Sequence, residues 1–433
     1  MKCGFAKVDI TPRVGCRLAG YPQLRISREL ADPLHIRALV FEEDSFALFL
    51  VFDVMAMDTA TAGDVRSRVS DALGCRRDQI HVCATHTHTS PYTSHIGDPL
   101  GDAFVDLLAH HALEAAQKAI ADEEEAQFTF AESTLEGISF MRRYRMRDGS
   151  VRTNPGRHNP EILEPVSPAD ESIRLLRIVR DKGDILLVGF QVHPDVRQDL
   201  CISADYPGVL CDTLEGALPG THAIYFNGTA GDLNHIDVNC APWDKNKGTE
   251  QMTHMGRTIA GKILSMCTKA QPIRTGAVRT AQEQVTLPRW QPTPEQLERA
   301  SAYIRWHEEG EQGEPPYDGG MGVTHNLVEA IRVLAQARLT GELSLPVCAA
   351  VMGDLAVVTV PGEGFCRLGM ELRRRSGCPA TIALGLTNAY GGYFPTRDAF
   401  EVGGYEVRTS PFTPGVAEAI LEAGLRLVEA CKQ

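Results

Sequence analysis

The chain has 433 residues, of which 43% are hydrophobic, and it carries a formal net charge of −13 at pH 7. This length and hydrophobic content allow a large buried core, whereas the negative charge argues against nucleic-acid partners and against docking on anionic lipid. No apolar run approaches the roughly 20 residues that cross a bilayer, so we expect no stable membrane association.

Strand and helix patterns alternate along the chain. The expected strands are residues 37–41, 46–52, 173–179 and 185–192, and the expected helices are 58–72, 104–120 and about 413–430. Short polar turns join the strands in pairs, so each pair is predicted to be a β-hairpin. Because hairpins are antiparallel, we predict an α/β fold with mixed, partly antiparallel sheets flanked by helices.

The segment from about 289 to 341 differs in composition from its surroundings. Thr293 and Pro294, followed by Gln296, have the pattern of a capped helix start, and Thr324 can cap a second helix. We therefore predict a helical insertion between strands. It could form a lid or a wall of a substrate site, or it could be an oligomer contact or a cover of the core.

Four segments share one design, in which an apolar strand runs into a potential metal ligand. Their ends are His86-Thr87-His88, His193, Glu363 and Tyr393. Two neutral imidazoles, a carboxylate and an oxygen donor suit zinc and leave room for a water or a substrate oxygen. Each residue also has a simpler interpretation, since His193 precedes a proline that could end a strand and Glu363 could start a helix. The convergence of four strand ends favours the metal site.

Six motifs follow one another along the chain. They are AKVDITP (6–12), ATHTHTSP (84–91), HPD with ISADYPG (193–195 and 202–208), NGTAGDLN (227–234), PGE (361–363) and NAYGGY (388–393). Together they resemble the successive signatures of the neutral/alkaline ceramidases, and the resemblance covers most of the chain in the right order. It implies a single catalytic domain of residues 1–433 and one zinc ion. The implied ligands are His86, His193, Glu363 and Tyr393, and the residues implied around the scissile carbonyl are His88, Arg142 or Arg143, and Tyr405.

The chain departs from the family pattern in two places. The serine of the family's GDxS motif falls on Asn234, and a side-chain amide cannot form an acyl-enzyme. The immunoglobulin-like domain at the C-terminus of neutral ceramidases is also expected to be lacking. The two departures predict that long-chain ceramide is a poor substrate, while the metal chemistry is retained.

Other polar residues have competing interpretations. Asn234, Asp232 and His95 are candidates for substrate contacts, although a loop histidine such as His95 is more often a surface residue. Asp53 could orient a metal-binding histidine or cap a loop. His110, with its neighbour at 111, is interpreted as a helix-face residue because nothing nearby has ligand spacing.

We therefore expect a zinc-dependent hydrolase that cleaves the amide, or a related carbonyl bond, of a small or polar N-acyl compound with a metal-activated water. His88, or Glu363 in part, would manage the proton, and Tyr405 with an arginine at 142 or 143 would stabilise the oxyanion. The alternatives are an esterase or lactonase, a zinc-assisted isomerase of a sugar-like compound, and a non-catalytic zinc-binding protein.

The partner and the compartment are predicted more coarsely. We expect a small-molecule substrate, and the oligomeric state stays open, with a homo-oligomer as one option. The twelve cysteines are scattered without a CxxC pair, and the chain opens without an apolar secretion signal. Reduced thiols and a cytoplasmic location are therefore expected.

Overall fold

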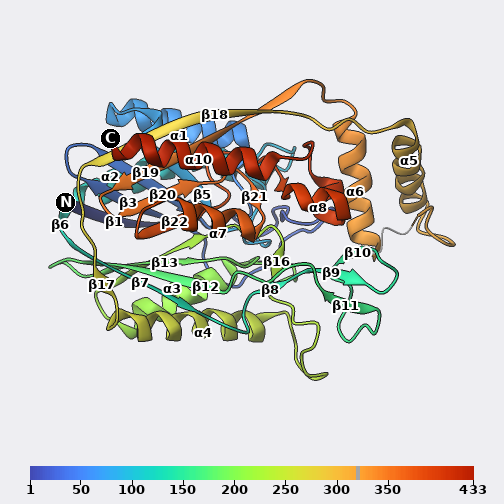
Figure 1. Cartoon of the computed structure of the whole chain (residues 1–433), viewed down its shortest axis with the longest axis horizontal. Coiled ribbons are helices and arrows are strands. Elements are labelled where there is room, and N and C mark those ends of the chain that lie inside the picture. The colour runs from blue at the N-terminus through green and yellow to red at the C-terminus, as the bar shows by residue number, and fades with distance from the viewer. Residues whose placement is uncertain (318–321) are drawn as a thin grey trace.

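The structure is a computed structural model that describes residues 1–317 and 322–433. Residues 318–321, which fall within the predicted insertion, lie outside the described residues. In the described part, three large sheets enclose a central apolar core, and helices cover their outer faces. Figure 1 shows these layers edge-on, with α10 (Val416–Lys432) on one side of the sheets and α4 (Thr249–Cys267) on the other.

The first sheet comes from the N-terminal part of the chain. Its strands, in spatial order, are β5 (Ile80–Ala84), β4 (Phe46–Phe52), β3 (His35–Glu42), β1 (Lys2–Asp9) and β6 (Glu124–Glu125). Leu39 and Phe41 face the central core, whereas Ala38 and Val40 face the helices α1 (Thr59–Leu73) and α2 (Pro99–Ala121). The alternation has the period of two that a strand buried on both faces requires.

The second sheet is built in the same way. Its strands, in order, are β15 (His222–Asn227), β13 (Ile185–Phe190), β12 (Ser172–Val179), β7 (Gln127–Thr134) and β17 (Gln271–Pro272). Ile185 and Leu187 face the central core, and Leu186 and Val188 face the side that α3 (Asp205–Ala217) and α4 cover. Both hairpins expected from the sequence are present, as β3–β4 and β12–β13.

The third sheet completes the enclosure of the core. Its strands are β18 (Val278–Pro288), β19 (Glu342–Met352), β20 (Leu355–Thr359) and β22 (Ala380–Leu384), covered by α7 (Cys366–Arg375) and α10. Two helices, α5 (Pro294–Glu308) and α6 (Gly322–Gln336), lie between β18 and β19 in the chain. They pack on each other through Tyr303, Leu327 and Val333.

Short elements fill the space around these sheets. They are β2 (Glu29–Leu30), β8 (Phe140–Met141), β9 (Arg143–Met146), β10 (Val151–Thr153), β11 (Ile162–Pro165), β14 (Cys201–Ile202), β16 (Leu233–Asn234), β21 (Glu363–Gly364), β23 (Tyr393–Phe394), the 3-10 turn η1 (Arg77–Gln79), α8 (Arg397–Val402) and α9 (Tyr405–Thr409). Several of them belong to the sequence motifs, so these motif residues lie in short strands outside the three large sheets, although they are mostly buried.

Each large sheet contains a parallel pair of strands, namely β4 with β5, β13 with β15, and β20 with β22. The loops at the carboxyl ends of these strands carry the sequence motifs, and such loops form the binding crevice in open α/β sheets. Here they are hydrogen-bonded to one another, since His88 N donates to Pro194 O at 3.1 Å and Glu363 N donates to Gly392 O at 2.8 Å. The fold therefore brings the motifs of all three sheets to one place.

The prediction of an α/β fold with mixed, partly antiparallel sheets is confirmed. Three helix starts were predicted wrongly. Thr324 does not cap α6, because Gly322 and Val323 before it are already helical. Helix α2 begins earlier, at Pro99, because the Asp98 carboxylate caps it by accepting from Gly101 N at 3.2 Å. Helix α10 begins at Val416 rather than at Pro414, because Gly415 has φ 113° and is not helical.

Two further observations concern the composition. Across the two described segments, no helix has both the length and the hydropathy of a membrane span. Within the same segments, all twelve cysteines are free thiols.

Candidate metal centre and active site

The strand ends deliver four potential ligands. His86 follows β5 and has φ 81°, a conformation that is uncommon for a residue with a side chain. His193 follows β13. Glu363 and Tyr393 open the two short strands β21 and β23, which pair in parallel with Glu363 opposite Tyr393. Gly231 packs directly against β21, because a Cβ there would lie 2.4 Å from the carbonyl oxygen of Glu363.

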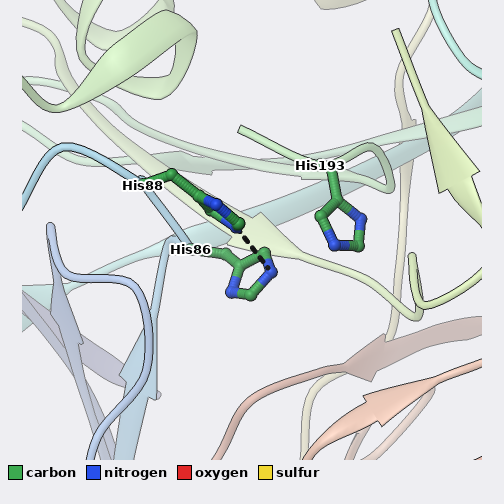
Figure 2. A group of neighbouring side chains, drawn as sticks. All are labelled: His86, His88 and His193. Atoms are coloured by element: carbon green, nitrogen blue, oxygen red, sulfur yellow. Dashed lines mark hydrogen bonds between the residues drawn. The ribbon is translucent and has the colours of Figure 1, made fainter. Parts of the chain in front are cut away.

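The imidazoles of His86, His88 and His193 form a compact group. Figure 2 shows the three rings turned toward a common space, and one nitrogen of each lies within 4.8 Å of the others. The Nε2 atoms of His86 and His88 are 3.4 Å apart. Oε2 of Glu363 lies 3.1 Å from Nε2 of His193 and 3.6 Å from Nε2 of His86. The Glu363 carboxylate therefore adjoins two of the three imidazoles that could hold a metal.

The tautomers of two of these histidines follow from their backbone contacts. Nδ1 of His86 lies 2.6 Å from the carbonyl oxygen of Met55, and Nδ1 of His193 lies 2.9 Å from that of Ala230. Because a carbonyl oxygen only accepts, each Nδ1 carries a proton, so a neutral ring has its lone pair on Nε2. Metal-binding histidines are held in the same way. Burial, together with the charge of Arg142, lowers the pKa of His193 to about 4, so this ring is neutral at pH 7.

The carboxylate of Glu363 completes this arrangement. Its Oε2 atom is buried and has no hydrogen-bond donor among the described residues, although it faces the Nε2 atoms of His86 and His193. In a neutral ring the Nε2 lone pair and the carboxylate oxygen can both bind a metal cation. The nitrogen and oxygen donors suit zinc, so these residues fit the ion that the ceramidase resemblance implies.

Two tyrosines of the NAYGGY motif flank this carboxylate. The hydroxyl of Tyr390 donates to Oε1 of Glu363 at 2.6 Å, and burial raises the pKa of this phenol well above its usual value, which keeps the proton on it. The ring of Tyr393 contacts both Tyr405 and Arg142. Its centroid is 5.8 Å from the ring centroid of Tyr405 and 5.4 Å from Cζ of Arg142. Tyr390 thus fixes the carboxylate, whereas Tyr393 lies beside Tyr405 and Arg142.

Arg142 is held rigidly at the centre of the site. Its Nε atom donates to Glu406 at 2.7 Å, and one Nη atom donates to the carbonyl oxygen of Gly231 at 2.7 Å. The other Nη atom lies 3.2 Å from Nε2 of His193. Arg143 instead pairs with the opposite oxygen of Glu406 at 3.4 Å and donates to Gly403. The structure therefore places Arg142, and not Arg143, beside the histidines.

Three other candidates lie outside the cluster. His95 is exposed and pairs with Asp106 at 2.9 Å on the surface of α2. The carboxylate of Asp232 accepts from the backbone N–H of Cys366 at 2.7 Å, at the start of α7. The amide of Asn234 is occupied on both sides, since it donates to Asn154 at 2.5 Å and accepts from Ile236 N at 3.0 Å. All three side chains therefore contact other protein groups and lie outside the histidine cluster.

The alternative roles of Asp53 can also be compared with the structure. Its carboxylate accepts from Arg37 at 2.9 Å and from His35 N at 2.9 Å. His86 uses the Met55 carbonyl instead, so Asp53 joins the ends of β3 and β4 and does not contact a histidine of the cluster. His110 lies exposed on α2.

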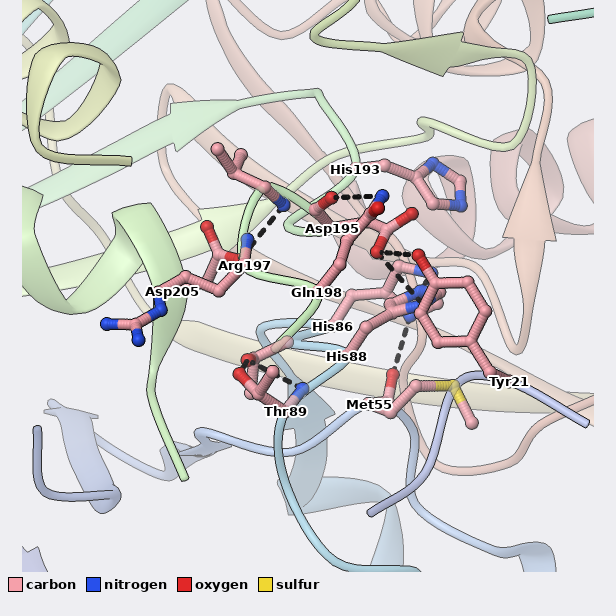
Figure 3. A network of polar contacts seen from close by, with 12 residues as sticks. Tyr21, Met55, His86, His88, Thr89, His193, Asp195, Arg197, Gln198 and Asp205 are labelled. Atoms are coloured by element: carbon pink, nitrogen blue, oxygen red, sulfur yellow. Dashed lines mark hydrogen bonds and ion pairs between the residues drawn. The ribbon is translucent and has the colours of Figure 1, made fainter. Parts of the chain in front are cut away.

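The sequence interpretation missed a polar group that surrounds His88 (Figure 3). Asp195 lies 3.7 Å from Nδ1 of His88 and accepts a hydrogen bond from the hydroxyl of Tyr21. Arg25 donates to the carbonyl oxygen of His88 at 2.9 Å, and Gly20 packs so closely that a Cβ there would lie 2.7 Å from Nδ1. Asp195 belongs to the HPD motif and could have been found, whereas the segment around Tyr21 has no pattern that marks it.

Replacing Tyr390 by phenylalanine is expected to weaken zinc binding by about 10- to 100-fold, the usual effect of losing a group that orients a metal ligand. The reason is the lost hydrogen bond to Oε1 of Glu363. Zinc affinity would be measured by competition with a chromophoric chelator. Tyr92→Phe, at a half-buried tyrosine beside Arg17, is the matched control. Equal affinities of the two variants would show that Tyr390 does not position the carboxylate.

Comparisons with known proteins give a result at the level of the fold. No model of a protein family matches the sequence, and no characterised protein matches it by sequence either. The crystal structure of neutral ceramidase from Pseudomonas aeruginosa superposes with a TM-score of 0.74, at 18% identity over 99% of this chain and 74% of that one. A ceramidase complexed with C2 gives a TM-score of 0.73, at 16% identity over 100% of this chain and 75% of that one. The chain therefore has a neutral ceramidase-like fold.

Proposed function

We propose that the protein is a zinc-dependent hydrolase that cleaves the amide, or a related carbonyl bond, of a small or polar N-acyl compound. The main support is the orientation of His86 and His193, whose Nδ1 atoms are held by backbone carbonyls and whose Nε2 atoms face the Glu363 carboxylate. We propose these three residues and Tyr393 as the zinc ligands. The fold adds support, because the similar structures are ceramidases and ceramide is itself an N-acyl compound.

A bound zinc would lower the pKa of a water from about 16 toward about 7 and polarise the substrate carbonyl. The side chains do the rest of the chemistry. His88 accepts a proton from the attacking water and delivers it to the leaving amine as the C–N bond breaks, which yields a carboxylic acid and an amine. Arg142 and the hydroxyl of Tyr405 donate to the oxyanion, an effect of roughly 3 kcal/mol for each donor.

Two observations favour a polar substrate over long-chain ceramide. Asn234 stands at the family's serine position, and its amide is engaged by Asn154 and Ile236, so it offers no nucleophile. A cavity of about 350 Å³ opens beside Arg142. Its lining mixes apolar residues such as Ile236 and Val238 with the polar side chains of Asn154, Gln198, His235 and Asn246. A long alkyl chain would leave these polar groups without partners, at a cost that a polar substrate avoids.

The proposal is tested by loading the purified full chain with zinc and by measuring both metal content and hydrolysis. We expect about one zinc per chain, hydrolysis of short N-acyl amines, and slow cleavage of long-chain ceramide. Activity on esters or lactones alone would identify an esterase or lactonase, since the same groups serve that chemistry. Bound zinc without any hydrolysis would indicate a non-catalytic zinc protein, and full activity without metal would refute the proposal.

Two broader expectations belong with this function. We propose that residues 1–433 act as a single catalytic domain in which α5 and α6 form an insertion that borders the site. We also propose a cytoplasmic location, supported by the twelve free cysteines of the described chain, because a reducing compartment keeps such thiols unpaired.

A further inference from the structure

One face of α6 is turned toward the active site. Residues His325, Glu329 and Arg332 follow at helical spacing, so they lie on the same face. The ring of His325 contacts that of Tyr405, with centroids 5.1 Å apart, and Glu329 pairs with Arg408 at 2.7 Å. The opposite, apolar face packs on α5, and Figure 1 shows α6 between α5 and the body of the protein.

Arg332 is the residue of this face that has no charged partner. Glu329 is already paired with Arg408, and the described residues give the Arg332 guanidinium neither an ion pair nor a hydrogen bond. One Nη atom lies 3.9 Å from the position that a Cβ on Gly392 would take, next to Tyr393. The side chain reaches solvent, yet it lies over packed groups that act on its charge.

Side chains of the active site affect the pKa of this guanidinium. Burial against them lowers the pKa of Arg332, but the net effect is to raise it, because phenol and carboxylate groups of the site lie close by: Tyr390, Tyr405, Tyr393 and Glu363. A free guanidinium beside proposed metal ligands, in a protein with a net charge of −13, offers a bidentate site for an anion.

We propose that Arg332 binds a carboxylate of the substrate, so that the substrates are N-acyl amino acids or similar anionic N-acyl compounds. This inference rests on the proposed function and adds the substrate class. Arg332 lies beside Gly392, the residue before the proposed ligand Tyr393, which suits a carboxylate that lies only a few bonds from the scissile amide, as in an N-acyl amino acid. The insertion thus acts as a specificity wall.

The test compares N-hexanoylglycine with its carboxamide, which differs only in charge. We expect the zinc-loaded wild type to prefer the carboxylate by about 10- to 100-fold in kcat/KM, the factor that corresponds to a hydrogen bond to a charged group. Arg332→Gln should reduce this ratio at least tenfold. Arg305→Gln, which removes an exposed arginine of α5, is the matched control and should keep the wild-type ratio.

A binding measurement separates this inference from the function. Hexylsulfonylglycine and its carboxamide carry a sulfonamide in place of the scissile N-acyl bond, so calorimetry reports recognition at this position without its cleavage. We expect tighter binding of the carboxylate by at least tenfold, and loss of the difference in Arg332→Gln. Equal binding of the two analogues by the wild type, or an equal loss of both in the variant, would overturn the inference. Discrimination without any hydrolysis would instead refute the proposed function and keep the carboxylate site.

Discussion

Replacing His193 by alanine is expected to remove bound zinc and to lower turnover by at least about 10⁴-fold, because a reactive hydroxide at neutral pH depends on the shift in the pKa of water that the metal provides. His193 is placed to bind through Nε2, since its Nδ1 atom is tied to the Ala230 carbonyl at 2.9 Å. The ring also lies 3.1 Å from the Glu363 carboxylate, so its loss opens the centre of the cluster.

The measurement is zinc content by elemental analysis together with kcat on a short N-acyl amine. His110→Ala is the control, because His110 is an exposed histidine on α2. Circular dichroism should show the same fold in both variants. If His193→Ala retained stoichiometric zinc and wild-type turnover, the proposed metal centre would be wrong.

The parts of the site that could be predicted are those fixed by strand ends. Apolar runs of four to eight residues identify buried strands, and a polar residue directly after such a run must emerge at the sheet edge. For this reason His86 and His193 could be placed together before any coordinates were known. The same argument named Glu363 and Tyr393, and the structure places these two residues opposite each other in the β21–β23 pair.

The parts that could not be predicted depend on direction and on distant contacts. Arg142 and Arg143 are neighbours in an extended segment, so their side chains point to opposite sides, and the sequence does not say which side is the site. Only the structure shows that Glu406 forms ion pairs with both arginines. Likewise, Tyr21 approaches Asp195 across 174 positions of the chain, a contact that no local pattern announces.

The arrangement of the sheets could not be predicted from the sequence. The hydrophobic residues of a strand show that both of its faces are buried, but they do not show that three separate sheets share one central core. The misplaced starts of α2 and α10 have local causes, the caps at Asp98 and Gly415, which outweigh the apolar periodicity. The sequence also does not show that Arg332 lacks an ion-pair partner among the described residues. This follows only because Glu329, on the same helix face, is paired with Arg408.

Replacing His88 by alanine is expected to leave zinc bound and to lower kcat by about 10²- to 10⁴-fold, the usual contribution of a general acid–base group. The structure allows a competing role, because His88 belongs with His86 and His193 to a group of three imidazoles that could hold a metal. The variant distinguishes the two roles. If His88 is a metal ligand, His88→Ala should lose zinc. If His88 only carries protons, the variant should keep zinc.

The surroundings of His88 favour the proton carrier. Its Nδ1 atom faces the Asp195 carboxylate at 3.7 Å and no backbone carbonyl, unlike the Nδ1 atoms of His86 and His193. A carboxylate beside Nδ1 stabilises the imidazolium that forms when Nε2 takes up a proton. Asp195→Asn should therefore keep zinc and reduce kcat less than His88→Ala does. Loss of zinc in His88→Ala would make His88 a metal ligand and transfer the base role to Glu363.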